Sequence, residues 1–159
     1  QILPRASAKP KDVLKATLQY QYGTSAASKF AGSTLEISRK TGRIRRVWKG
    51  GINTGTLLGT LRPHDGFFLP TKEGAKLLGA SIKKVMIPDK EAAGFVKRGK
   101  SAFAKFCRPL ADISPGEEVA LVGKDREILA VGRAKLSSDE MEEMERAKEF
   151  VLVALVPVV

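Results

Sequence analysis

A dense group of cations in the first half of the chain could bind the phosphates of a nucleic acid. Its members are Lys40, Arg43, Arg45, Arg46 and Lys49. Binding RNA needs little more than cations at phosphate spacing on a surface of suitable shape. Because alternate residues of a strand share a face, Arg43 and Arg45 should point to the same side. Arg46 should then point with Ile44 and Trp48 unless a bulge intervenes. We expect at least two of the three arginines to reach solvent; the alternative is a solvated hairpin face that binds nothing.

A second group of candidate residues surrounds Gly99. This glycine has no Cβ, so a phosphate or a ribose could approach the backbone there. Phe103 and Phe106 are three residues apart, so on a strand their rings point to opposite faces. One ring should then pack in the core and the other could be exposed. Core packing is the default expectation for each. The candidate RNA-binding residues beyond the three arginines are Arg62, Lys97, Arg98, Gly99, Lys100, Ser101, Lys105, Arg133 and Lys135.

Residues that could support catalysis are sparse. His64 stands beside Asp65, which could orient its imidazole as a base, and Cys107 could in principle be a nucleophile. We favour a structural interpretation of each: His64 is a histidine in a turn, and Cys107 is a small strand residue beside Phe106. Neither a P-loop nor a G-x-G-x-x-G motif occurs, and one Cys with one His cannot supply four zinc ligands. We therefore predict no enzyme, no metal site and no cofactor.

Composition describes a folded, strongly basic chain of 159 residues with a net charge of +11. The hydrophobic fraction of 43% argues against a disordered tail, and the single cysteine excludes an internal disulfide and favours the cytoplasm. The chain begins at Gln1, as a cut end would, and no apolar run suggests a signal peptide. The longest apolar run, residues 150–159, is far shorter than the roughly 20 residues that cross a bilayer.

The positive charge is concentrated in the first half. Residues 1–83 carry 15 basic and 4 acidic side chains, whereas residues 84–159 carry 13 of each. Such asymmetry favours a polyanion as the partner of this half. The alternative is that the positive charge only keeps the protein soluble. A membrane surface is disfavoured because no basic amphipathic helix is present. The five acids between Asp139 and Glu145 predict a face turned away from RNA or a contact for a basic protein.

The pattern of residues 1–83 predicts a small α+β unit behind a flexible arm at residues 1–11. Pro10 suits the first turn of a helix, and Thr71 suits an N-cap. The turn around Gly42 joins two alternating segments into a hairpin. The expected elements are helices over 10–23, 25–30 and 71–78 and strands over 34–39, 43–48, 56–62 and 67–69.

Residues 84–159 have a different rhythm of short strands and turns, which is typical of a compact barrel. Asp89 should cap a short helix that ends at Lys97, and Ser137 with Glu140 forms a capping box before another helix. The expected strands are 84–87, an extended stretch over 101–107, 118–122, 128–136 and a last apolar strand from Phe150.

Several motifs in this half occur in a characteristic order. They are Arg98-Gly99-Lys100-Ser101, Phe103-Ala104-Lys105-Phe106, the turn Pro115-Gly116-Glu117-Glu118-Val119, and the strand Ile128 to Ala134 followed by Ser137-Ser138-Asp139-Glu140-Met141. On these residues, 84 to about 156 resemble a PUA domain, an RNA-binding module. In such domains the short helix, the glycine loop after it and a neighbouring strand form the RNA groove.

Three motifs of the first half extend the resemblance. Gln19-Tyr20-Gln21-Tyr22-Gly23, the segment from Ile37 to Arg45, and the segment from Thr60 to Phe68 are similar to the small domain that precedes the PUA domain in archaeal tRNA-guanine transglycosylases and related archaeosine proteins. The resemblance implies an α+β fold, with a small α+β domain at 12–83 and a PUA-type pseudo-barrel of mixed short strands with two short helices at 84–159.

The family comparison also shows two departures. The connection over Gly50–Gly55 is longer than the family's, and the last strand, residues 150–156, carries no basic residue, which suggests a buried or protein-covered surface. The chain is also too short for the family's catalytic barrel of about 250 residues and lacks its zinc ligands.

The resemblance implies a non-catalytic RNA-binding protein in the cytoplasm. The favoured ligand is tRNA, gripped at its acceptor end in a modification pathway such as archaeosine formation. One alternative is an interaction subunit or fragment that completes a separate transglycosylase-type catalytic protein. Another is a PUA factor associated with the ribosome or translation.

Overall fold

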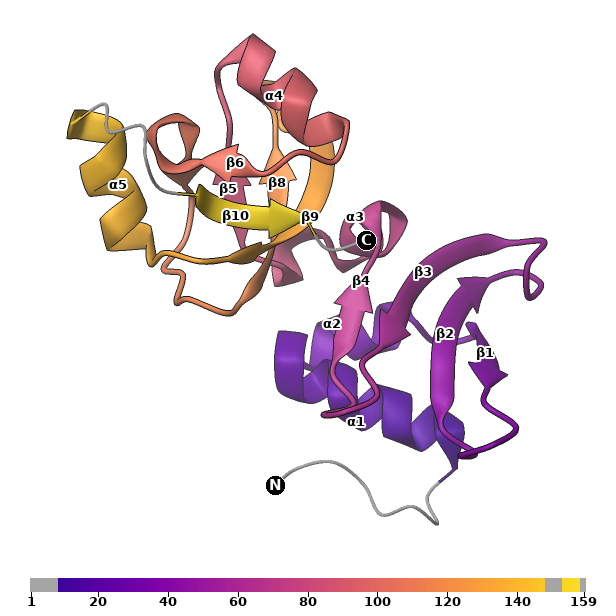
Figure 1. The fold of residues 1–159 in the computed structure, drawn as a ribbon. Coiled ribbons are helices and arrows are strands. Elements are labelled where there is room, and N and C mark those ends of the chain that lie inside the picture. Colours follow the sequence, from indigo (N-terminus) through magenta and orange to yellow (C-terminus); the bar gives the residue numbers. More distant parts are fainter. Residues whose placement is uncertain (1–8, 148–152, 158–159) are drawn as a thin grey trace. The chain divides into compact units, whose positions relative to one another are not determined.

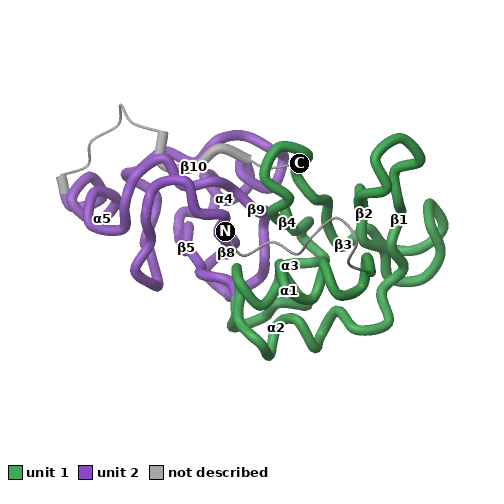
Figure 2. The backbone as a smooth tube through the Cα atoms, turned by 90° about the horizontal axis from the view of Figure 1, so that it is seen from below, with its two compact units in different colours: residues 1–81 green, residues 82–159 purple. Residues whose placement is uncertain are grey.

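The computed structural model describes residues 9–147 and 153–157. The chain divides into two compact units, residues 1–81 and 82–159, which are coloured separately in Figure 2. None of the described helices is long and apolar enough to cross a membrane.

Over its described residues, from 9 onward, unit 1 combines a four-stranded antiparallel sheet with three α-helices (Figure 1). The strands follow the chain order across the sheet, β1-β2-β3-β4, so each neighbouring pair is joined by a direct connection. The elements are α1 (Pro10–Tyr22), α2 (Thr24–Lys29), β1 (Thr34–Ile37), β2 (Ile44–Lys49), β3 (Thr56–Leu61), β4 (Phe68–Pro70), α3 (Lys72–Leu78) and a 3-10 turn (Gly79–Ser81).

The core of unit 1 lies between the helices and one face of the sheet. Leu18 of α1 and Phe68 of β4 are fully buried, and the ring of Phe30, which ends α2, meets Phe68 edge-on at 5.3 Å. Burying a side chain of this size stabilises a fold by about 1.5–3 kcal/mol. Gly59 and Gly74 have no Cβ at contacts where one would collide with the Phe68 ring and the Leu58 carbonyl, respectively. Small residues therefore set how closely α3 and β4 approach β3.

Unit 2 is built on a six-stranded mixed sheet in the order β6-β10-β9-β8-β5-β7, with two α-helices (Figure 1). The β5–β8 pair is parallel and the other pairs are antiparallel. The elements are β5 (Lys84–Met86), α4 (Lys90–Lys97), β6 (Ala102–Phe103), a 3-10 turn (Ala104–Phe106), β7 (Arg108–Pro109), β8 (Glu118–Val122), β9 (Ile128–Ala134), α5 (Ser138–Ala147) and β10 (Val153–Pro157).

The predicted helix starts are confirmed by their capping bonds. The Thr71 hydroxyl accepts the Gly74 amide at 3.2 Å, and the Asp89 carboxylate accepts the Ala92 amide at 2.9 Å. The capping box forms reciprocally, since Ser137 Oγ accepts the Glu140 amide and Glu140 Oε1 accepts the Ser137 amide. Each cap satisfies an amide that the first helical turn leaves without a backbone partner.

The expectation of an extended stretch over 101–107 was wrong at residues 104–106, whereas Cys107 is extended again. Residues 104–106 form a single 3-10 turn, closed by the bond from the Cys107 amide to the Ala104 carbonyl at 3.0 Å. The turn buries Ala104 completely beside α5. The strand predicted from Phe150 is seen from Val153 to Pro157, whereas its start at residues 150–152 and all of its side chains lie outside the described part. Most of the arm at 1–11 also lies outside, and α1 begins within it, at Pro10.

Candidate nucleic-acid interface

The end of α4 presents exposed cations around a glycine turn. The Lys100 amide donates to the Phe95 carbonyl at 3.1 Å and the Gly99 amide to the Val96 carbonyl at 2.9 Å, which is the Schellman pattern. Gly99 has a φ of 91°, a left-handed conformation that other residues adopt only with strain, and no atom would lie within 4 Å of a Cβ there. Lys97, Arg98, Gly99 and Lys100 are all exposed. The turn therefore leaves an approachable backbone among three cations.

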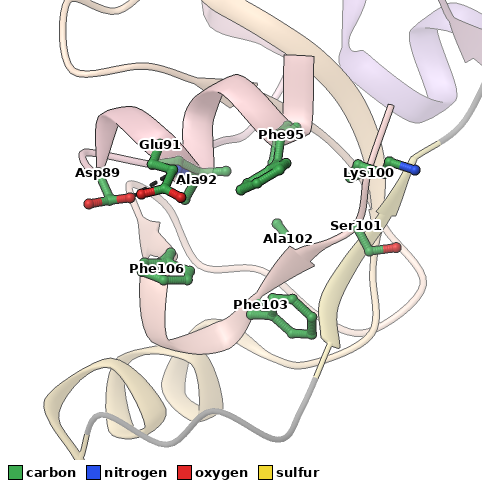
Figure 3. A pocket seen from close by; sticks show the side chains of 11 residues that line it. Asp89, Glu91, Ala92, Phe95, Lys100, Ser101, Ala102, Phe103 and Phe106 are labelled. Atoms are coloured by element: carbon green, nitrogen blue, oxygen red, sulfur yellow. Dashed lines mark hydrogen bonds between the residues drawn. The ribbon is translucent and has the colours of Figure 1, made fainter. Parts of the chain in front are cut away.

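An apolar cavity of about 570 Å³ lies beside this turn (Figure 3). Its walls come from α4, from the strand and 3-10 turn that follow, and from the end of β5. Phe95 is 44% exposed and Phe103 is 36% exposed, so two of its rings are open to solvent. The lining residues are Ile87, Asp89, Glu91, Ala92, Phe95, Val96, Lys100, Ser101, Ala102, Phe103 and Phe106.

The two phenylalanines differ in exposure, but not through strand parity, because Phe106 lies in the 3-10 turn and Phe103 in β6. Phe106 is partly buried and packs against the core, but Phe103 is exposed at the cavity, which corrects the default of core packing for that ring. Lys105 lies over the Phe106 ring, with its Nζ 4.9 Å from the ring centroid. Arg98 lies over the Phe95 ring, with its guanidinium carbon Cζ also 4.9 Å from the ring centroid. Cations held against aromatic faces are suited to a ligand that carries both phosphates and flat bases.

The cation group of unit 1 lies along β2. Arg43 and Arg45 are exposed, which confirms that at least two of the three arginines reach solvent. Glu36 pairs with Arg46 and Ile37 pairs with Ile44, so Arg45 is an extra residue that bulges from β2. Arg46 consequently lies on the opposite face from the buried Ile44. It forms an ion pair with Glu36 at 3.1 Å, a partner that the sequence analysis missed.

Arg62 is engaged within its own turn. Its Nε donates to Asp65 Oδ1 at 3.1 Å, its Nη2 lies 3.0 Å from Oδ2 on the same edge of the guanidinium, and its side chain is 17% exposed. Partial burial opposes ionisation of Asp65, but the Phe67 amide and the Arg62 guanidinium outweigh it and lower the pKa of the carboxyl. Because one edge of its guanidinium pairs with both oxygens of Asp65 and its side chain is mostly buried, Arg62 stabilises the β3–β4 turn and we leave it out of the interface.

Of the remaining candidates, Arg133 lies in β9 and Lys135 directly after it, whereas Ser101 directly precedes β6. Arg133 is 36% exposed and its nearest guanidinium nitrogen is 3.8 Å from Glu118 Oε1. Lys135, just beyond the strand, is exposed, and Ser101 is half-buried in the cavity wall. In unit 2, Lys100 and Ser101 therefore line the cavity, and Arg98 contacts the Phe95 ring in its wall. Arg133 and Lys135 are not among the lining residues.

The groups considered for catalysis do not assemble. Cys107 is completely buried, and burial raises the pKa of its thiol to about 12, so it is protonated at neutral pH. His64 Nε2 lies 3.5 Å from Asp65 Oδ2, but that carboxylate already binds Arg62 and the Phe67 amide. No group of three His, Cys, Asp or Glu side chains that could hold a metal occurs among the residues that the structure describes.

Comparisons with known proteins agree with this two-unit organisation. Residues 12–84 match the patch-forming domain C2 of tRNA-guanine transglycosylase, and residues 83–150 match the PUA domain. A PUA domain from Aeropyrum pernix K1 shares the fold with a TM-score of 0.63 at 20% identity, covering 99% of this chain and 83% of that one. A hypothetical protein from Pyrococcus horikoshii gives the same TM-score at 18% identity, and the match covers 94% of this chain and 88% of that one.

By family match, residues 83–150 of this chain belong to the PUA domain family, within a protein of mixed α+β structure. The proteins it resembles in sequence are the archaeal tRNA-guanine(15) transglycosylases, in their C-terminal region. The Pyrococcus furiosus protein is 40% identical over 134 residues, 80% of this chain and 22% of that protein. The Methanobrevibacter smithii protein is 36% identical over 138 residues, which are 83% of this chain and 20% of that protein. The chain thus spans about a fifth of the length of these relatives.

Proposed function

We propose that this protein binds RNA without catalysing a reaction on it, that its ligand is tRNA, and that it acts in the cytoplasm in tRNA modification. The observation that carries the proposal is the arrangement at the end of α4. Three exposed cations, Lys97, Arg98 and Lys100, surround the Gly99 turn, and Lys100 lines a cavity whose rings Phe95 and Phe103 are open to solvent.

The proposed mechanism combines phosphate contacts with stacking. The backbone of a single-stranded segment follows Lys97, Arg98 and Lys100, and an unpaired base lies against the exposed rings. Stacking of a base on an aromatic side chain contributes about 1–3 kcal/mol and is tolerant of sequence. Arg43 and Arg45 on unit 1 add contacts to phosphates. RNA is therefore recognised by charge and shape, and the unpaired acceptor end of tRNA suits the cavity.

The choice of tRNA draws support from the relatives, whose names specify tRNA-guanine(15) transglycosylase. The matched part is their C-terminal region, and the chain spans about a fifth of them. Within the described residues, the buried Cys107 thiol and the turn residue His64 supply no assembled catalytic group. A binding role is the function these features support best.

Filter binding with bulk tRNA tests the proposal. If about six phosphates are contacted, raising the salt concentration from about 50 to 200 mM should weaken binding on the order of a thousandfold. Removing the 3′-terminal unpaired nucleotides should weaken binding further at fixed salt. A nearly flat salt dependence would refute RNA binding, and equal affinity for intact and truncated tRNA would refute acceptor-end recognition.

A second candidate function is that of an interaction subunit for a separate catalytic chain. It is favoured by the extent of the matches, which cover 20% and 22% of the two relatives. The test adds this chain to a transglycosylase lacking its own C-terminal region and measures base exchange in tRNA. Stimulation together with co-elution supports the subunit; unchanged activity and separate elution count against it.

A further inference from the structure

One carboxylate of unit 1 holds two side chains of the neighbouring strand. Glu36 Oε2 accepts a hydrogen bond from Arg46 Nη1 at 3.1 Å, and Glu36 Oε1 accepts one from Trp48 Nε1 at 3.1 Å. Glu36 and Arg46 are direct cross-strand partners on β1 and β2. Both carboxylate oxygens are thus engaged, and the position of the arginine is fixed with respect to a large ring.

The three side chains lie on the face of the sheet opposite the buried core. Val47 pairs with Gly59, and a Cβ on Gly59 would meet the ring of Phe68, which packs against Phe30. Paired residues of antiparallel strands point to the same face, so Val47 points to the helices. Arg46 and Trp48, its neighbours on the strand, point away from them.

The exposures within this cluster are unequal. The Glu36 side chain is 17% exposed, whereas that of Arg46 is 39% exposed. The partly buried carboxylate strengthens a charge-assisted hydrogen bond that would be weak in open water. A guanidinium has five donors in a rigid plane, and the bond to Glu36 uses one of them at Nη1. The solvent-facing edge of Arg46 is therefore oriented before any ligand arrives.

We propose that Glu36 is a positioning residue that orients Arg46 to bind one phosphate of an RNA backbone. The proposal rests on the proposed function. Thr60, the cross-strand partner of Arg46 on β3, points to the same face and offers a hydroxyl beside the phosphate. A preoriented arginine loses less side-chain entropy on binding than a free one, so this contact strengthens binding although Glu36 itself repels phosphate.

The two effects of Glu36 have opposite signs, which makes the proposal testable. If Glu36 acted only through its charge, Glu36→Gln would tighten RNA binding, because a repulsive negative charge is removed. If Glu36 positions Arg46, the same substitution weakens binding, because the glutamine amide cannot replace the charged hydrogen bond. We expect Glu36→Gln to weaken binding of bulk tRNA by about fivefold to tenfold.

Glu73→Gln is the matched control. Glu73 also lies in unit 1 and pairs with a cation, Lys76, at 3.2 Å, but both side chains are well exposed on α3. Neutralising Glu73 removes the same charge without disturbing an oriented arginine, so it should leave tRNA binding unchanged or slightly tighter. Weaker binding by Glu36→Gln together with this control result supports the proposal. Binding by Glu36→Gln that is equal to or tighter than that of the unaltered protein overturns it.

Two further variants separate positioning from a folding defect. In an Arg46→Gln background, Glu36→Gln should no longer weaken binding, because the side chain that it positions is gone. Glu36→Asp keeps the charge but shortens the side chain, and it should also weaken binding; an unchanged affinity overturns the proposal. Far-UV circular dichroism shows whether each variant folds, because Trp48, the single tryptophan of the chain, donates to Glu36 directly and its emission responds to the substitution itself.

The failure of this inference differs from the failure of the proposed function. If the unaltered protein does not bind tRNA at all, both are overturned. If it binds with the expected salt dependence but Glu36→Gln binds as tightly, only the role of Glu36 is overturned.

Discussion

The guanidinium carbon of Arg98 lies 4.9 Å from the centroid of the Phe95 ring, at the wall of the apolar cavity in unit 2. Both residues are exposed, and they lie on the last turn of α4 and its C-cap. The ring restrains the cation, and the cation leaves part of the ring open to solvent. This pairing places the cation that we propose binds a phosphate directly beside the ring that we propose stacks on a base.

We predict that Phe95→Leu weakens tRNA binding by about tenfold, because leucine keeps the apolar contact but removes the flat surface for a base. Filter binding at fixed salt measures the effect. Leu110→Ala is the control, since Leu110 is similarly exposed in unit 2 but is not among the cavity residues. Equal losses in the two variants would show that the ring of Phe95 has no specific role.

We predict that Gly99→Ala lowers the free energy of unfolding of unit 2 by about 1–2 kcal/mol. The cause is the φ of 91°, which an alanine adopts only with strain. Urea unfolding followed by circular dichroism measures the change.

Gly94→Ala is the matched control within α4. Gly94 has helical geometry and open space around a Cβ, so alanine should stabilise the helix by about 0.5–1 kcal/mol. Destabilisation of the same size at both positions would argue against backbone strain as the cause at Gly99.

The features that the sequence predicted well are those decided locally. Thr71, Asp89 and Ser137 each cap a helix within three residues of their own position, so the pattern and the structure agree. The pairing of Arg62 with Asp65 is equally local, three residues apart in a turn, but that signal was not used, and Arg62 was predicted to bind RNA instead.

The features that the sequence did not predict depend on register and packing between distant segments. Glu36 reaches Arg46 only because β1 and β2 pair in one register, and the extra residue Arg45 reverses which side chains face the core. The cavity beside Phe95 likewise needs α4, β6 and the 3-10 turn to be packed together. No spacing along the chain encodes these relationships directly.

We predict that Asp65→Asn destabilises unit 1 by about 1 kcal/mol near neutral pH, because the bonds to Arg62 and the Phe67 amide are weakened. The lowered pKa of Asp65 means that the unfolded chain binds the proton more readily than the folded one. Its contribution is present above the unfolded-state pKa and is lost as the pH falls through the folded-state pKa. The cost of Asp65→Asn should therefore shrink in acid.

Unfolding followed by Trp48 emission measures this effect in unit 1. Asp125→Asn, at the exposed hairpin of unit 2, is the control and should leave the transition of unit 1 unchanged. A cost of Asp65→Asn that stays constant into acid would contradict the linkage.

We predict that the stability of unit 2 falls in alkali through Cys107. Its thiol has a pKa raised from 9.0 to about 12 by burial, so above the unfolded-state pKa the unfolded chain loses a proton that the folded chain keeps. The resulting loss is at most about 1.4 kcal/mol per pH unit between the two pKa values. Cys107→Ala removes this loss, so the cost of the substitution should be smaller at about pH 10.5 than at neutral pH.

The same burial makes the thiol inert in the folded protein. A thiol-specific chromogenic disulfide should react with Cys107 slowly at mildly alkaline pH and rapidly once denaturant unfolds unit 2, since the thiolate is the reactive form. The rate in the folded protein then reports the opening of the core around Ala104 and Cys107, both of which are completely buried. A fast reaction in the folded protein would show that the thiol is accessible and would contradict both the buried placement and the alkaline effect that follows from it.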